Sequence, residues 1–229
     1  MNNISCLRCS IKGNIALQCS LVLSGIKPSN LLIYNNHCEG CISEELKNTG
    51  AEHMKLYTGY TGKNDSVSII FNRGKLEKAL LDEENREFIK QYGYNNFDVN
   101  NVIEKLAGRY TEFKEGRAEF PHEMGIVLGY PLEDVSGFIE NNGKNYLYSG
   151  YWKVYKNAEE KIQLFKIYKD IKKYFVEQIE NGRQIHQICY ECREFAVRAF
   201  FSIVAVGYVL IARAYWKEWK DWKENYDKK

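Results

Sequence analysis

The sequence predicts an α+β fold: a small three-stranded, mostly antiparallel sheet covered by helices, with a helical C-terminal extension. Residues 54–61 and 67–72 are rich in Tyr, Ile and Val and flank a polar, Gly-containing turn, which is the pattern of an antiparallel hairpin. Residues 146–155 have the Tyr, Trp and Val content of a strand and supply the expected third strand. Segments with the 3.6-residue periodicity of helices lie around these runs.

Helices are expected on both sides of the hairpin. Residues 11–24 form an apolar run that Gly25 ends as a C-cap, and residues 44–51 form a short helix. Residues 75–92 have helical character interrupted by polar residues. The clearest amphipathic helix spans residues 99–113, because its apolar side chains fall on one stripe.

The turn around Lys27 leaves two structures open. Ser29 or Asn30 could cap a short helical segment through residues 31–33. A capped helix start beside a lysine can hold an anion. The alternative is a plain connection between two helices.

Residues 120–155 are the part of the chain richest in residues that interrupt helices and strands, with two of the three prolines and five of the glycines. Pro121 and Pro131 each suit the first turn of a helix, where the missing N–H is not needed. A long helix is expected over residues 158–181. We place the end of the α+β domain at residue 182, so that residues 183–229 form the extension.

The composition is that of a soluble globular protein, with 45% hydrophobic and 27% charged residues. A net charge of +2 gives no general attraction to nucleic acid. The first residues lack the apolar core of a secretory signal. We therefore expect a cytoplasmic protein with reduced cysteines.

The seven cysteines form three CxxC pairs and one single residue. Two of these pairs, Cys6/Cys9 and Cys38/Cys41, could together supply four thiolates for zinc or another metal such as iron. Their separation is longer than in common zinc ribbons. Each pair could instead be a coincidence of helical spacing.

His122 and Glu123 indicate general acid/base chemistry, although the spacing of a zinc-protease motif is absent. Arg109 lies at the edge of the amphipathic stripe, where it could hold an anion or extend to water. A helix-turn-helix around residues 128–140 is also conceivable. Its second helix would carry Glu133, Asp134 and Glu140 without Lys or Arg, so we expect no nucleic-acid binding.

The C-terminal segment combines an apolar run, residues 199–212, with aromatic residues and lysines beyond it. This pattern is typical of a membrane interface. The run is short for a membrane span, although a span over residues 196–214 stays open. The alternatives are packing on the domain, on a membrane surface or on a second copy through residues 195–226.

Several motifs resemble one known family. They are Cys19-Ser20-Leu21, the run from Gly25 to Leu31, Phe120-Pro121-His122-Glu123, Leu128-Gly129-Tyr130-Pro131-Leu132-Glu133-Asp134-Val135 and Gly150-Tyr151-Trp152-Lys153-Val154-Tyr155. Over roughly residues 11–174 the chain resembles the bacterial domain-of-unknown-function family 3793. The resemblance implies a cytosolic protein with an iron or redox context. It also singles out the following positions: Lys27, Arg109, His122, Glu123, Asp134, Lys144, Trp152 and Lys153.

Three functions follow as expectations. The first is a ligand-binding or accessory protein of iron or redox metabolism, with a site formed by Lys27, Arg109 and the strand residues Tyr151, Trp152 and Lys153. The second is an enzyme in which His122, beside Glu123, is the general base on an anionic substrate. The third is an interaction protein that associates with membranes through its C-terminal helix.

Overall fold

The structure, a computed structural model, describes residues 11–49, 54–189 and 191. The α+β prediction is confirmed. Its main sheet has the order β1-β3-β2 and is antiparallel throughout, with β1 at Ser29–Asn35, β2 at Met54–Thr61 and β3 at Asp65–Asn72. The predicted hairpin is β2–β3, which the Gly62 N–H closes by donating to the Asp65 carbonyl at 2.8 Å.

The third strand comes from a different part of the chain than the sequence suggests. Residues 29–35 form β1, so neither of the two structures left open after Lys27, a capped helical segment or a plain connection between two helices, is correct. This stretch pairs along β3, with Leu31 opposite Ile69. The predicted strand 146–155 forms instead a separate hairpin of β4 (Tyr148–Ser149) and β5 (Lys153–Val154). Cap residues are a local signal, and strand pairing outweighs them here.

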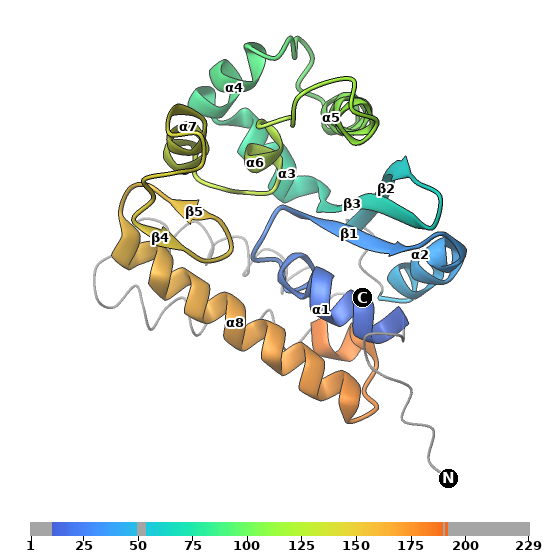
Figure 1. Ribbon diagram of the computed structural model, residues 1–229. Coiled ribbons are helices and arrows are strands. Elements are labelled where there is room, and N and C mark those ends of the chain that lie inside the picture. Colours follow the sequence, from blue (N-terminus) through green and yellow to red (C-terminus); the bar gives the residue numbers. More distant parts are fainter. Residues whose placement is uncertain (1–10, 50–53, 190, 192–229) are drawn as a thin grey trace.

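Helices cover both faces of the sheet (Figure 1). On one side lie α1 (Ile11–Leu23), η2 (Asn36–Cys38), α2 (Glu39–Lys47) and α8 (Ala158–Glu180). On the other side lie α3 (Arg73–Leu81), α4 (Glu83–Lys90), α5 (Val99–Lys114), α6 (Met124–Val127) and α7 (Leu132–Glu140). The predicted helices 11–24, 99–113 and 158–181 therefore correspond to α1, α5 and α8.

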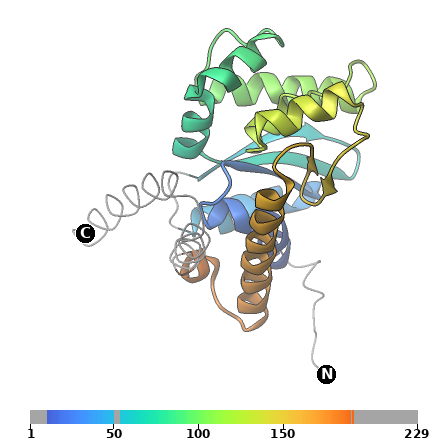
Figure 2. The ribbon, with the colours of Figure 1, turned by 90° about the vertical axis from the view of Figure 1, so that its left-hand side faces the viewer.

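The sheet separates two apolar cores because successive residues of a strand point to opposite faces. In β3, Ile70 belongs to the core under α1 and α8, whereas Ile69 and Phe71 belong to the core under α3 to α7. The β4–β5 hairpin lies between α7 and α8 in both ribbon views (Figures 1 and 2). This position brings the end of β5 against α7.

After α8 the chain returns to the first core. Ile185, Ile188 and Cys189 are buried there, next to side chains of α1 and α8. Glu191 binds Arg183 at 2.5 Å and accepts a hydrogen bond from the Tyr174 hydroxyl at 2.5 Å. The predicted C-terminal interaction segment, residues 195–226, lies outside the described residues. None of the helices that the structure describes is long and apolar enough to cross a membrane.

Candidate functional site

Asp134 anchors the end of β5 to the first turn of α7. Its carboxylate is buried, and Oδ2 accepts a hydrogen bond from Trp152 Nε1 at 2.8 Å. Its Oδ1 accepts from the backbone N–H groups of Tyr155, at 2.8 Å, and Lys156, at 3.2 Å. Three donors on one carboxylate hold the chain after β5 in a defined position, because charge-assisted hydrogen bonds are stronger than neutral ones.

Lys161 adds a third element to this connection. Its buried ammonium donates to Glu133 Oε1 at 2.7 Å and to the Lys156 carbonyl at 2.9 Å, and it lies 3.6 Å from Asp134 Oδ2. Burial alone would raise the pKa of the Glu133 carboxyl. The hydrogen bond and the charge of Lys161 outweigh it and hold that pKa below its ordinary value.

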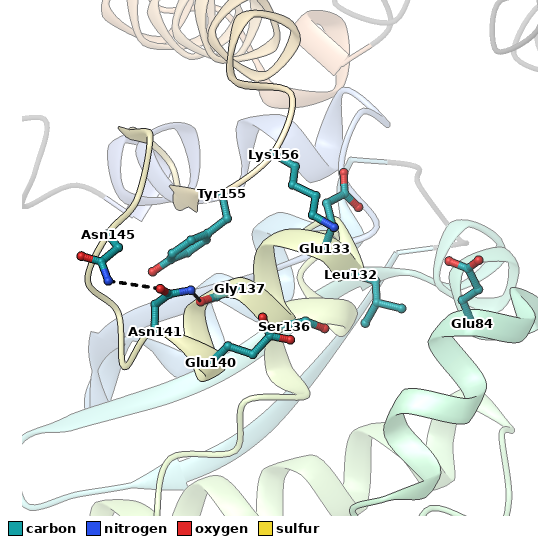
Figure 3. A pocket seen from close by; sticks show the side chains of 10 residues that line it. All are labelled: Glu84, Leu132, Glu133, Ser136, Gly137, Glu140, Asn141, Asn145, Tyr155 and Lys156. Carbon is teal, nitrogen blue, oxygen red and sulfur yellow. Dashed lines mark hydrogen bonds between the residues drawn. The ribbon is translucent and has the colours of Figure 1, made fainter.

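A polar pocket of about 430 Å³ lies beside this anchored segment (Figure 3). One wall is α7, through Glu133, Ser136, Gly137 and Glu140. The other wall is formed by Asn141, Asn145, Tyr155 and Lys156, and Glu84 of α4 borders the remaining side. The volume is in the range of small-molecule sites.

Tyr155 packs against α7 at Gly137. A Cβ atom at Gly137 would come 2.5 Å from Cγ of the Tyr155 ring, so this close contact requires glycine. The hydroxyl points toward the Asn141 and Asn145 end of the pocket (Figure 3). Its oxygen is buried and has no hydrogen-bond partner among the described residues. Burial, followed by the neighbouring Tyr146 and Asp134, raises the pKa of Tyr155.

The loop after α7 is held by its own hydrogen bonds. Asn142, Gly143 and Asn145 have φ angles of 50°, 69° and 55°, in the left-handed region that Asn and Gly tolerate best. Lys153 Nζ donates to the Gly143 carbonyl at 2.6 Å, and Asn141 Nδ2 donates to the Gly137 carbonyl at 2.9 Å. The wall of the pocket is therefore shaped by the chain itself.

The two residues of the predicted His122–Glu123 pair lie in different environments. Glu123 is 1% exposed, and its Oε1 binds Arg109 Nε at 2.5 Å and the Tyr94 hydroxyl at 3.1 Å. Its Oε2 is buried without a hydrogen-bond partner in the part of the chain that the structure describes. The half-buried His122 ring instead contacts the rings of Phe120 and Phe138, with centroids 5.6 and 5.7 Å away.

Lys27 is buried beside Tyr130. Its Nζ donates to Asn30 Oδ1 at 3.0 Å and lies 5.3 Å from the centre of the Tyr130 ring. Burial lowers the pKa of Lys27 to about 8. Tyr130 in turn stacks on Trp152 at 4.9 Å, which joins Lys27 to the Asp134 network.

The remaining strand candidates have structural neighbours of their own. Tyr151 packs on Phe165 and Tyr168, and Lys153 lies over the rings of Phe138 and Tyr146. His122 and Lys153 thus both contact Phe138. The pocket is lined by other residues: Lys27, Arg109, His122, Glu123, Tyr151, Trp152 and Lys153 are all outside it.

The metal prediction stays a prediction, because Cys6 and Cys9 lie outside the described residues. Cys38 precedes α2 and Cys41 is exposed on it. Within residues 11–49, 54–189 and 191, no group of three or more His, Cys, Asp or Glu side chains is placed to hold a metal ion. The described part therefore offers no complete site for zinc or iron.

None of the residues that line the pocket was among the candidate site residues that the sequence indicated. The alternation of side chains along the predicted strand 146–155 could have indicated Tyr155. Trp152 and Val154 are buried, and Tyr155 lies on the opposite face from Val154. Nothing local showed that Glu84 of α4 and residues of α7 would line one pocket with Tyr155 and Lys156.

A family model described as a protein of unknown function (DUF3793) matches residues 15–189. The match covers the main sheet, both cores, the pocket and the returning residues 185–189. It confirms the resemblance carried by the sequence motifs. No curated protein and no solved structure matches the chain.

Proposed function

The chain belongs to the family of proteins of unknown function DUF3793, and from this premise we propose that it binds a small polar ligand in the pocket beside α7. The observation that carries the proposal is a pocket of about 430 Å³ whose walls are held in place by buried interactions. A site shaped before binding loses less conformational entropy when a ligand arrives.

Polar groups in this pocket are available to a ligand. Ser136, Glu140 and Glu84 line it and make no side-chain hydrogen bond or ion pair within the described residues. The charged side chains in the wall already have partners. Asp134 accepts hydrogen bonds from Trp152 and from the Tyr155 N–H, and Lys161 donates to Glu133. The pocket therefore has walls held by hydrogen bonds and polar side chains that can bind a ligand, which supports the proposal.

The other expected functions have less support. The proposed general base His122 lies outside the pocket, in contact with two aromatic rings, so an enzyme that uses it stays a prediction. The iron or redox role rests on the family resemblance and on cysteine pairs of which Cys6 and Cys9 lie outside the described residues, so it stays a prediction. The membrane role rests on residues 195–226, which also lie outside them, and stays a prediction too.

The proposal is tested by filling the pocket. Ser136→Trp places a large ring on the pocket side of α7, and Asn101→Trp on the exposed side of α5 is the matched control. A library of small polar fragments is titrated into labelled protein and followed by NMR. We expect fragments that shift the Gly137, Asn141 and Tyr155 amides in wild type and Asn101→Trp, and no such shifts in Ser136→Trp. Fragments that bind both variants equally would exclude this pocket as the site.

A further inference from the structure

Large apolar side chains that remain exposed are gathered in one region of the described chain. Among residues 11–49, 54–189 and 191, nine such side chains are exposed. Three of them, Ile33, Tyr57 and Leu81, lie apart from one another in the chain. Single exposed apolar side chains are ordinary, whereas a group of them is typical of an interaction surface. The other six form such a group: Phe113, Phe120, Phe138, Tyr146, Leu147 and Tyr148.

Ring contacts join this group across segments that are separate in the chain. Phe113 at the end of α5 meets Phe120 edge to face, with ring centroids 5.3 Å apart. The His122 ring follows, 5.6 Å from Phe120 and 5.7 Å from Phe138 of α7. His122 therefore lies between the two phenylalanines and makes the apolar surface continuous from α5 to α7.

Lys153 extends this surface to the segment before β4. Its Nζ lies 5.6 Å from the centre of the Phe138 ring and 5.0 Å from that of Tyr146. His122 and Lys153, two candidate residues that the pocket does not use, thus belong to one surface. We call this surface the aromatic strip, and it consists of Phe113, Phe120, His122, Phe138 and Tyr146 with the adjoining Leu147 and Tyr148.

The exposed apolar area of the strip matches one side of a stable protein interface. The six apolar side chains are between 36% and 64% exposed. At roughly 200 Å² for a large side chain, these fractions leave about 500 Å² open to water. A standard interface covers about 800 Å² on each partner, of which a little more than half is apolar. The strip therefore supplies the apolar area that such an interface requires.

The α5 end of the strip is acidic. Glu112 and Glu119 are both exposed and stand next to its two phenylalanines in the chain. Of the nearby cations, Arg117 pairs with Glu115, and Lys114 extends over a ring of β2 at 5.3 Å. Two carboxylates at this end are therefore left to attract a cation from outside the chain.

The opposite end of the strip is basic. Lys144 is exposed there, and Lys153 lies between the rings without a carboxylate partner among the described residues. The carboxylate of Glu140 lies on another side of α7, where it lines the pocket. The strip thus has opposite charges at its two ends and apolar side chains between them.

A surface of this kind is complementary to itself. In a dimer with two-fold symmetry, the same surface serves both partners, and each end of one copy meets the other end of its mate. The rings then cover one another, and the acidic end of each copy faces the basic end of the other. We propose that the aromatic strip is the interface of such a dimer, so that its partner is a second copy of this chain. The proposal goes beyond ligand binding in the pocket and does not depend on it.

Sedimentation of the full chain over a wide range of concentrations tests the proposal. The variant pair Phe120→Ser/Phe138→Ser removes two rings of the strip. Ile33→Ser/Leu81→Ser is the matched control, because both of its side chains are exposed and apolar but lie outside the strip. We expect a dimer in wild type and in the control. The dimer of the strip pair should be at least about tenfold weaker, because buried aromatic side chains supply much of the binding energy of an interface.

Charge reversal gives a second test that leaves the rings in place. Glu119→Lys and Lys144→Glu should each weaken the dimer, by about two- to fivefold for every contact changed. Each contact occurs twice in a two-fold dimer. The variant that carries both changes restores opposite charges across the interface, so its dimer should recover most of the wild-type strength.

Three outcomes would overturn the proposal. A chain that stays monomeric at every concentration has no such interface. A dimer that Phe120→Ser/Phe138→Ser leaves unchanged is held together elsewhere, for example through residues 195–226. If the two charge reversals weaken the dimer separately and no less when combined, the ends of the strip do not face each other.

Discussion

Lys27 buries an ammonium group that no carboxylate of the described residues pairs with. Its hydrogen bond to Asn30 and its position over the Tyr130 ring offset part of the cost of removing the charge from water. The rest of that cost appears as a pKa lowered to about 8. The charge on Lys27 therefore opposes folding wherever the group is protonated in the native state.

The sign of the pH dependence follows from this pKa. Between about 8 and the ordinary value of 10.5, the native protein has lost the Lys27 proton while the unfolded chain still holds it. The free energy of unfolding then rises with pH across that window, by up to about 3 kcal/mol. Below pH 8 both states are protonated and the native state carries the full penalty.

We therefore predict that Lys27→Met removes this pH dependence. At pH 7 the variant should be as stable as the wild type or more stable, because an apolar side chain replaces an unpaired buried charge. The measurement is urea unfolding at several pH values from 7 to 10.5. The exposed Lys169→Met should keep the wild-type profile. Parallel profiles for wild type and Lys27→Met would show that Lys27 is not the titrating group.

Glu123 is buried in a different way. Arg109 and Tyr94 both bind Oε1, while Oε2 has no partner within the described residues. Burial and the Glu123 carboxylate together raise the pKa of Tyr94, which keeps that hydroxyl protonated as a donor. In the structure the Arg109–Glu123 ion pair joins α5 to the start of α6, whereas the sequence predicted acid/base chemistry for Glu123 and ligand binding for Arg109.

At the scale of elements, the turn from α6 to α7 depends on a single glycine. Gly129 has a φ of 76°, and a Cβ atom there would lie 2.5 Å from Cδ of Pro28. Pro28 immediately precedes β1, so the contact positions the start of α7 against the main sheet. Both the backbone conformation and the lack of space exclude a side chain.

We predict that Gly129→Ala lowers the free energy of unfolding by about 2–4 kcal/mol, from left-handed backbone strain and the clash together. Gly116→Ala is the matched control, since its φ is 72° but no heavy atom lies within 4 Å of the added Cβ. It should cost only the backbone part, about 1 kcal/mol. Chemical denaturation of both variants measures the difference, and equal losses would mean that the Pro28 contact adds nothing.

At the scale of the whole molecule, residues that follow α8 are part of the apolar core. Ile185 and Ile188 are 1% and 0% exposed and lie in the core between α1 and α8. Burying each of them is worth about 1.5–3 kcal/mol. Together these contributions are a large share of the stability of an ordinary domain.

A chain that ends after Asn181 should accordingly be less stable than one that ends after Glu191, by about 3–6 kcal/mol. The longer chain keeps the buried isoleucines and the Arg183–Glu191 ion pair. Circular dichroism during urea unfolding compares the two. Equal midpoints would support the division at residue 182 that the sequence suggests, with residues 183–229 as an independent extension.

Local patterns were sufficient for much of this fold. The apolar stripe of residues 99–113, the hairpin of residues 54–72 and the helix start at Pro131 were each predicted correctly, because the signal for each lies within one short segment. The strand at residues 29–35 was missed for the opposite reason. Its identity depends on the edge of β3, thirty-odd residues later in the chain.

The α+β fold class and the family could both be predicted from the sequence alone, because each depends on local patterns and short motifs. The contacts made by residues 120–155 could not be predicted in this way. Asp134 binds Trp152 and the segment after it, and Glu123 binds Arg109 and Tyr94. The pocket is lined by α7, the loop after it and Tyr155, with Glu84 of α4 at its border. These partners are distant in the chain. Buried charges need hydrogen-bond donors, and which donors lie within reach depends on how the two cores pack. The periodicity of a single sequence does not contain that information.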